Sequence, residues 1–127
     1  MPVKKTNRSM SLFAAVVFAS AVPACAHHSY AVFDASKKLA LNGTAAQFQW
    51  TNPHSWLRLA VPGAGGKVTI WDLELGSPVG NANLGWRPKD IKRGDKLSVV
   101  INPRRDGSAG GGLVSVTLAD GRTLHAR

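Results

Sequence analysis

Short runs of alternating apolar and polar residues dominate the chain from residue 39 onward. Alternation of this kind places successive side chains on opposite faces of a β-strand. The runs are separated by turn signals rich in Gly, Pro, Asn and Asp, such as Pro62 to Gly66 and Asp120-Gly121. We therefore predict strands over residues 39–50, 55–61, 67–75, 96–102, 113–118 and 122–125.

The alternation also predicts which faces are buried. In the second run, one face carries Trp56, Arg58 and Ala60, and the other carries Leu57, Leu59 and Val61. In the third run, Thr69, Trp71, Leu73 and Leu75 share the face that we expect to point into the core.

Asp72 and Glu74 fall on the opposite face of the third run, two residues apart. We expect a solvent-exposed pair of carboxylates that balances Arg58 or Lys67. The alternative is an acid–base pair, which would require burial to separate the two pKa values.

The segment between the third and fourth runs is helical in character. Ser77 can cap a short helix whose first residue is Pro78, and Gly85 can end it. Five or six strands with a helix in this position predict a mainly β fold, a small OB-like and partly open barrel. A β-sandwich is the alternative. We expect a bulge or a sharp coil of the strand at Gly43 and a flexible hairpin loop over 104–112.

The first 26 residues have the layout of a secretory signal peptide. Three basic residues precede a short apolar stretch over 11–22, which is too short to span a bilayer as a helix. Ala24 and Ala26 form an A-x-A cleavage site. We thus expect a signal peptide at 1–26, an extended lead-in at 27–38 anchored by Phe33, and a barrel domain at 39–127 in the periplasm.

Cys25 is the only cysteine, so cleavage after Ala26 would leave a chain without thiol or disulfide. The alternative is cleavage before Cys25, because Val22 to Cys25 loosely resembles a lipobox. A lipid-modified Cys25 would leave His27 without a free amine.

Charge and length narrow the range of partners. Residues 27–127 hold thirteen basic and seven acidic residues, a net charge of +6 on a single small domain. The basic residues are scattered rather than arranged in a run, so no specific nucleic-acid partner is expected. The sequence is compatible with an envelope component or a metal ion as the partner. No second stretch is long enough to cross a membrane.

Cleavage after Ala26 would begin the chain with His27 and His28. An N-terminal histidine offers its amine and Nδ1 as one chelate, and a third nitrogen completes the set that Cu(II) prefers. His54, held in the Asn52-Pro53-His54 turn, is the best distant candidate for that nitrogen, with His28 as the other. The pattern predicts a copper-type site at His27, His28 and His54. The fourth histidine, His125, is expected on the surface of the last strand.

Four tryptophans are expected to form the walls and rim of the core. Trp50 and Trp56 flank the turn that holds Asn52. As an alternative function, Trp50, Asn52, Trp56 and Arg58 would bind an anionic or sugar ligand.

The residue patterns of common catalytic and structural metal sites are absent from the sequence. There is no C-x-x-C, H-E-x-x-H or G-x-S-x-G motif and no acidic calcium loop. This favours a binding protein over an enzyme. A non-catalytic accessory or scaffold protein and a histidine-brace enzyme remain the alternatives.

Several segments together resemble one family. They are HHSYAVFD, LNGTAAQFQWTNPHSWL, WDLELGSPVGNANLGW, KRGDKLSVVINPRRDGSAGG and LADGRTL. Over residues 27–124 the chain resembles the DUF6152 family, small exported bacterial proteins of unassigned function. The resemblance implies no activity, but it implies that the His-His start and the NPH turn belong to one recurring pattern. Asn102 before Pro103 departs from that pattern, and this departure affects only the expected shape of a loop.

Overall fold

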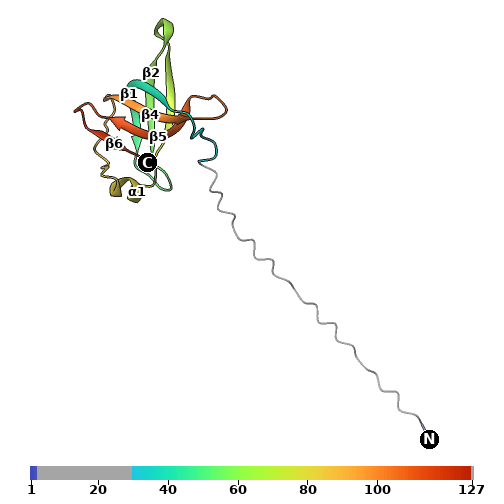
Figure 1. Cartoon of the computed structure of the whole chain (residues 1–127). Helices are drawn as coiled ribbons and strands as arrows, with labels where there is room; N and C mark the ends of the chain where they lie inside the picture. Colours follow the sequence, from blue (N-terminus) through green and yellow to red (C-terminus); the bar gives the residue numbers. More distant parts are fainter. Residues whose placement is uncertain (3–29, 127) are drawn as a thin grey trace.

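The computed structural model describes residues 1–2 and 30–126. The predicted signal peptide and its cleavage site, Cys25, His27 and His28 lie outside these ranges, apart from the first two residues. The elements, in chain order, are β1 (Leu39–Gln49), β2 (Trp56–Pro62), the 3-10 turn η1 (Ala64–Gly66), β3 (Val68–Glu74), α1 (Pro78–Asn83), β4 (Lys96–Pro103), β5 (Gly110–Thr117) and β6 (Thr123–His125) (Figure 1).

The strands form one sheet that closes on itself. Its order is β3-β2-β1-β4-β5-β6, and these neighbours are antiparallel. A parallel pairing of Asp72–Glu74 with Gly110–Gly112 joins β3 to β5 and closes a five-stranded barrel, to which β6 is added. This strand order, with a helix between β3 and β4, confirms the predicted OB-like barrel. Closure through one continuous sheet excludes the alternative of two packed sheets.

The closing strand pair corrects one prediction. Gly110, Gly111 and Gly112 were expected in a flexible loop, but they begin β5. A Cβ on Gly111 would lie 2.5 Å from the carbonyl oxygen of Asn102, and one on Gly110 would lie 2.9 Å from that of Asp72. The glycines are therefore needed where backbones approach closely at the barrel seam.

Gly43 has the same role, which corrects the bulge predicted there. A Cβ on Gly43 would lie 2.5 Å from the carbonyl oxygen of Ala60 on β2. The irregularity in the β1–β2 register lies instead between Ala45 and Gln47. Glycine is therefore required at position 43 by a close backbone contact and not by an extra residue in the strand.

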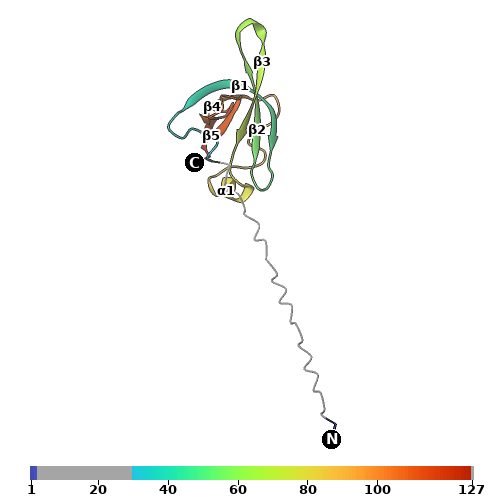
Figure 2. The same ribbon diagram turned by 90° about the vertical axis from the view of Figure 1, so that its right-hand side faces the viewer.

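Inward-facing side chains of all five barrel strands form the core. Leu57 and Leu59 of β2 are fully buried, and so are Leu73 and Leu75, which confirms the predicted core face of β3 near the barrel. Thr69 is exposed and Val61 half-buried, because the β2–β3 hairpin extends beyond the barrel (Figures 1 and 2). The other buried apolar side chains include Leu97, Val99, Ile101, Leu113, Val116 and Trp86.

The helix α1 begins and ends as its residues predict. The hydroxyl of Ser77 accepts a hydrogen bond from the backbone N–H of Gly80 at 3.1 Å, and Pro78 is the first helical residue. Gly85 follows with a φ of 92°, a conformation that favours glycine. The chain then turns Trp86 into the core, where its indole Nε1 donates to the carbonyl of His125 at 2.9 Å.

Candidate functional site

His54 lies in the loop between β1 and β2, and the end of β3 holds this loop. Thr51 Oγ1 donates to the carbonyl of His54 at 3.1 Å, across the cis Asn52–Pro53 peptide. The next residue, Ser55, is buried and exchanges backbone hydrogen bonds with Gly76 and Leu75 at 2.9 Å. The backbone of His54 is therefore fixed on both sides.

Glu74 of β3 holds the imidazole of His54. Nδ1 of His54 lies 2.5 Å from Oε1 of Glu74, with 29% of the His54 side chain and 4% of the Glu74 side chain exposed. The distance is that of an ion pair, and Oε1 has no other polar partner among the described residues. A carboxylate at one ring nitrogen leaves the other, Nε2, for a ligand, as in histidines that bind metals.

The burial of Glu74 corrects the predicted surface pair. Asp72 is partly exposed and pairs with Arg58 at 3.0 Å, as expected. Glu74 points outward from the same face of β3, but it is only 3% exposed as a residue. Alternation along a strand identifies the outward side, while burial depends on the segments that cover that side.

The lead-in brings the start of the described domain to His54. Phe33 is 3% exposed, which confirms it as the anchor, and it forms an isolated bridge with Arg104. Two backbone hydrogen bonds hold this segment, from Asp34 N–H to the Pro103 carbonyl at 2.8 Å and from Arg105 N–H to the Val32 carbonyl at 2.9 Å. The rings of Tyr30 and His54 lie 6.3 Å apart between centroids. The loop, β3 and the lead-in thus meet at one place.

A hollow of about 440 Å³ lies beside this meeting point. Its walls are the lead-in, the outward faces of β2 and β3, and the β4–β5 loop. Glu74 belongs both to this hollow and to the His54 contact. The residues that line it are Val32, Phe33, Trp56, Glu74, Arg104, Arg105 and Asp106.

Asp106, which lines the hollow, and Asp34, in the lead-in, both have lowered pKa values. Hydrogen bonds from the hydroxyl and the backbone N–H of Ser108, with the charge of Arg104, lower the pKa of Asp106. A hydrogen bond from the hydroxyl of Ser36 lowers the pKa of Asp34 in the same way.

The structure separates the four predicted ligand-binding residues. Trp56 lines the hollow next to Glu74. Arg58 pairs with Asp72 and lines a different hollow of about 600 Å³. Trp50 packs edge-on against Phe48, with the ring centroids 6.0 Å apart, and Asn52 is exposed in the loop. No single described hollow brings the four together.

Sequence reasoning missed Glu74 as a site residue, together with Tyr30 and Arg104. The signal available for Arg104 was the Arg104-Arg105 pair in a loop, but scattered basic pairs are common on surfaces. Nothing local connects Arg104 with Trp56, which lies far from it in the sequence.

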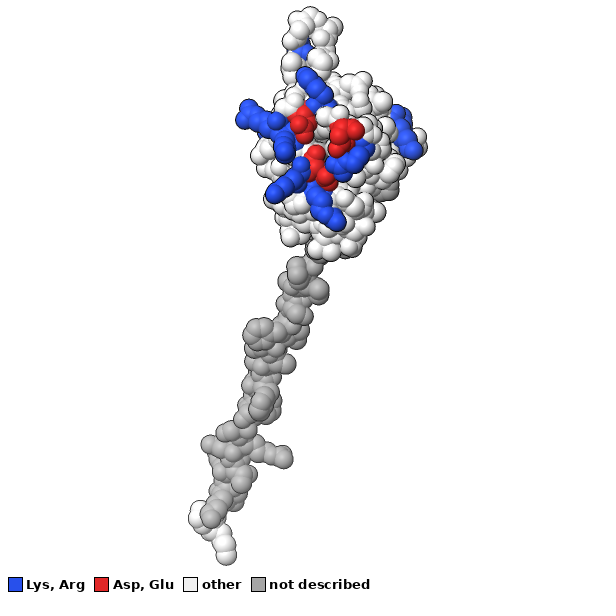
Figure 3. Space-filling view, turned by 90° about the vertical axis from the view of Figure 1, so that its left-hand side faces the viewer, with Lys and Arg blue, Asp and Glu red and all other residues white. Residues whose placement is uncertain are grey.

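Another charged surface of the domain contains internal ion pairs. Figure 3 shows acidic side chains surrounded by basic ones on one face of the barrel. Arg122 pairs with Asp90 at 3.2 Å and with Asp120 at 2.9 Å.

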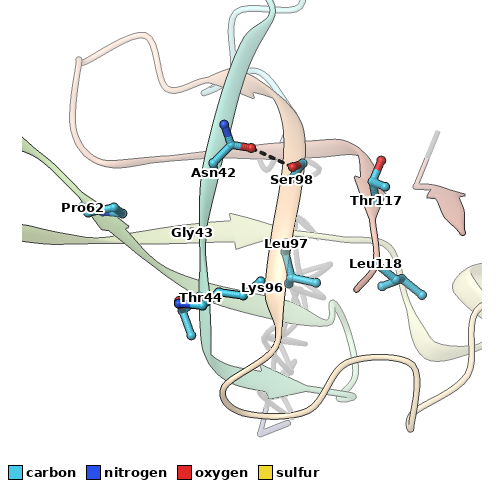
Figure 4. A pocket seen from close by; sticks show the side chains of 9 residues that line it. All are labelled: Asn42, Gly43, Thr44, Pro62, Lys96, Leu97, Ser98, Thr117 and Leu118. Atoms are coloured by element: carbon cyan, nitrogen blue, oxygen red, sulfur yellow. Dashed lines mark hydrogen bonds between the residues drawn. The ribbon is translucent and has the colours of Figure 1, made fainter. Parts of the chain in front are cut away.

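A further hollow of about 340 Å³ lies between β1, β4 and the ends of β2 and β5 (Figure 4). There, Lys96 Nζ donates to Thr44 Oγ1 at 2.9 Å and Ser98 Oγ donates to Asn42 Oδ1 at 2.7 Å. These polar groups bind one another across β1 and β4. This hollow therefore has fewer polar groups available to a ligand than the hollow beside Glu74.

Residues 1–2 and 30–126 contain no cluster of three or more His, Cys, Asp or Glu side chains that could hold a metal ion. Of the predicted metal ligands, His54 alone falls within these ranges. In the same part of the chain, no helix has the length and apolar character needed to cross a bilayer.

Together, the fold and the site define a small OB-like barrel with a candidate binding site where the β1–β2 loop, the lead-in and the β4–β5 loop meet. The chain belongs to the DUF6152 family of unknown function, whose model matches residues 15–114. This confirms the resemblance seen in the sequence.

Two further comparisons were made. No curated protein matches the chain. A crystal structure of the mitochondrial single-stranded DNA binding protein Rim1 from S. cerevisiae is similar, with 13% sequence identity and a TM-score of 0.49. The match covers 65% of this chain and 93% of that chain.

Proposed function

We propose that the protein is an exported, non-enzymatic periplasmic binding protein that holds a copper-type metal ion. The ligands are the amine and imidazole of His27, at the start of the processed chain, and the imidazole of His54. His28 is the alternative third ligand. The A-x-A site directly before His27 is the reason for placing the first residue of the processed chain at His27.

The contact between Tyr30 and His54 is the observation that carries the proposal. Tyr30 follows His27 by three residues, and three residues of extended chain span at most about 10 Å. Since the Tyr30 ring lies 6.3 Å from the His54 ring, a chain that begins at His27 can reach His54. The anchoring of Phe33 keeps this part of the chain near the loop.

The donor set suits copper. Two imidazoles and an amine give three nitrogen ligands, and nitrogen ligation in a tetragonal arrangement favours Cu(II). Glu74 at Nδ1 orients His54 so that Nε2 is the nitrogen available to the metal. Calcium and magnesium, which prefer oxygen ligands, do not suit this set.

The test is a Cu(II) titration of protein recovered from the periplasm after cleavage, followed by calorimetry and by electron paramagnetic resonance. We expect a Kd below about 1 µM and nitrogen hyperfine coupling. His54→Ala should weaken binding at least about tenfold, whereas His125→Ala on the exposed strand β6 should leave it unchanged.

Two outcomes would contradict the proposal. One is equal affinity in the wild type and His54→Ala. The other is an intact mass showing acylation at Cys25 or a first residue other than His27.

A further inference from the structure

We propose that the hollow beside Glu74 binds a small hydroxylated anion of the acidic-sugar class. The hollow shares Glu74 with the proposed metal site, but no metal is needed to form it. Its volume of about 440 Å³ lies within the roughly 300–1,000 Å³ of small-molecule sites. Three groups in it define the ligand: Arg104, Glu74 and Trp56.

Arg104 supplies a guanidinium for an anion. Its side chain is half-buried and makes no hydrogen bond or ion pair with any described residue. The guanidinium lies over Gly110, where a Cβ would be 2.6 Å from Nε and 3.0 Å from Cζ. The missing side chain at Gly110 thus makes room for Arg104 against the strand. A free planar fork of this kind binds a carboxylate or phosphate with two parallel hydrogen bonds.

Arg105, the neighbouring arginine, has a structural role. Its Nε donates to the carbonyl of Ala31 at 3.1 Å, and its guanidinium lies 3.9 Å from Asp34. Arg105 therefore fastens the lead-in that forms one wall, and Arg104 is the arginine left for a ligand.

Glu74 supplies an acceptor. It is almost fully buried, its Oε1 lies against Nδ1 of His54, and no described residue donates a hydrogen bond to its other carboxylate oxygen. Buried polar atoms are rarely left without a partner, so a donor from a ligand would satisfy that oxygen. A hydroxyl group provides such a donor without adding charge.

Trp56 supplies an apolar wall. It is half-buried next to Glu74 in the β2–β3 pairing and shares the hollow with Phe33 and Val32. An indole face covers the C–H face of a sugar ring well, since it offers a large and rigid apolar surface.

The three groups together select among ligand types. An inorganic anion would use Arg104 alone, and a neutral sugar would leave the guanidinium unpaired. A purely apolar carboxylate would leave Glu74 without a donor. Asp106, held as an anion at the rim, disfavours ligands with several negative charges. A sugar bearing one acidic group satisfies all three. The acid is a uronate carboxylate or a sugar phosphate, which share the chemistry that Arg104 recognises.

The experiment is a titration of the processed protein in EDTA, followed by the NMR signal of the Trp56 indole N–H, with glucuronate, glucose 6-phosphate and glucose as probes. We expect saturable shifts with at least one of the two anions, whose relative Kd values identify the acid, and at most weak shifts with glucose. Arg104→Gln should raise the Kd at least about tenfold, because it removes a charge-assisted pair. Arg104→Lys should give an intermediate value.

Arg58→Gln is the matched control. It removes an exposed arginine that is already paired with Asp72 in the neighbouring hollow, so the Kd should not change. Trp56→Phe keeps an aromatic ring and tests how much the indole contributes to the wall; since this variant lacks the indole N–H, its Kd is measured by calorimetry. Failure of both anions to saturate at about 20 mM would overturn the proposal, since such binding is too weak to be specific. Equal weakening by Arg104→Gln and Arg58→Gln would also overturn it. Because EDTA removes metal, neither outcome bears on the copper proposal.

Discussion

At the scale of single residues, Glu74 shows how position along a strand and burial can disagree. Its place in the alternation of β3 puts it on the outward side with Asp72. Asp72 stays accessible and pairs with Arg58, whereas Glu74 is covered and meets His54. Two carboxylates two residues apart therefore have different environments, and only one of them can orient a histidine.

We predict that Glu74→Gln weakens Cu(II) binding about 10- to 100-fold while the protein still folds, because groups that orient metal ligands contribute affinity of this size. Glutamine keeps the shape of the side chain and removes its charge. Calorimetry measures the Kd, and circular dichroism checks the fold. Asp72→Asn on the same strand face is the control and should leave the Kd unchanged. An unchanged Kd in Glu74→Gln would show that Glu74 has no role in metal binding.

At the scale of elements, the seam between β3 and β5 decides whether the sheet closes. Only three residues of each strand pair there, and on β5 all three are glycines. The seam also places Gly110 beneath Arg104, so closure and the candidate anion site depend on the same short segment.

We expect Gly111→Ala to destabilise the protein by about 1–3 kcal/mol, the usual cost of forcing an extra group into a packed region. Its Cβ would lie 2.5 Å from the Asn102 carbonyl and 2.8 Å from Ile101. Urea unfolding followed by fluorescence measures the loss. Gly63→Ala, in the exposed β2–β3 turn with an ordinary φ of −120°, should change stability by less than about 0.5 kcal/mol. Equal effects at the two sites would show that the seam tolerates side chains.

At the scale of the whole molecule, stability rests on packing and surface charge. The barrel encloses a single core, and the described residues contain no cysteine. On the surface, three aspartates have lowered pKa values. For Asp120 the main causes are hydrogen bonds from the backbone N–H and guanidinium of Arg122, and for Asp34 and Asp106 they are hydrogen bonds from Ser36 and Ser108.

These shifts predict a loss of stability in acid. A carboxyl whose folded-state pKa lies below its usual 3.8 contributes stability above that value, and this contribution disappears as the pH falls through the folded-state pKa. The urea concentration at the unfolding midpoint should therefore decrease once the pH is lowered below about 4. Asp106→Asn should show a shallower fall, since one of the three groups no longer titrates. A midpoint that rises on acidification would contradict the assignment. All three groups are exposed, so each effect should be small.

The sequence by itself determined the strands, the capped helix and the buried face of β3 near the barrel. These depend on signals within a few residues, namely period-two alternation, the Ser77-Pro78 cap and the turn residues. The place of the helix between the third and fourth strands was enough to indicate the OB-like barrel.

The tertiary structure alone decided the rest, because it depends on segments far apart in the chain. The glycines of β5 looked like a loop until β3 was placed beside them. Glu74 looked exposed until His54 covered it, and Arg104 had no connection with Trp56 until the lead-in and the β4–β5 loop formed a shared hollow. Local patterns determine which way a side chain points, whereas its neighbours across the fold determine whether it is buried, paired or left free for a ligand.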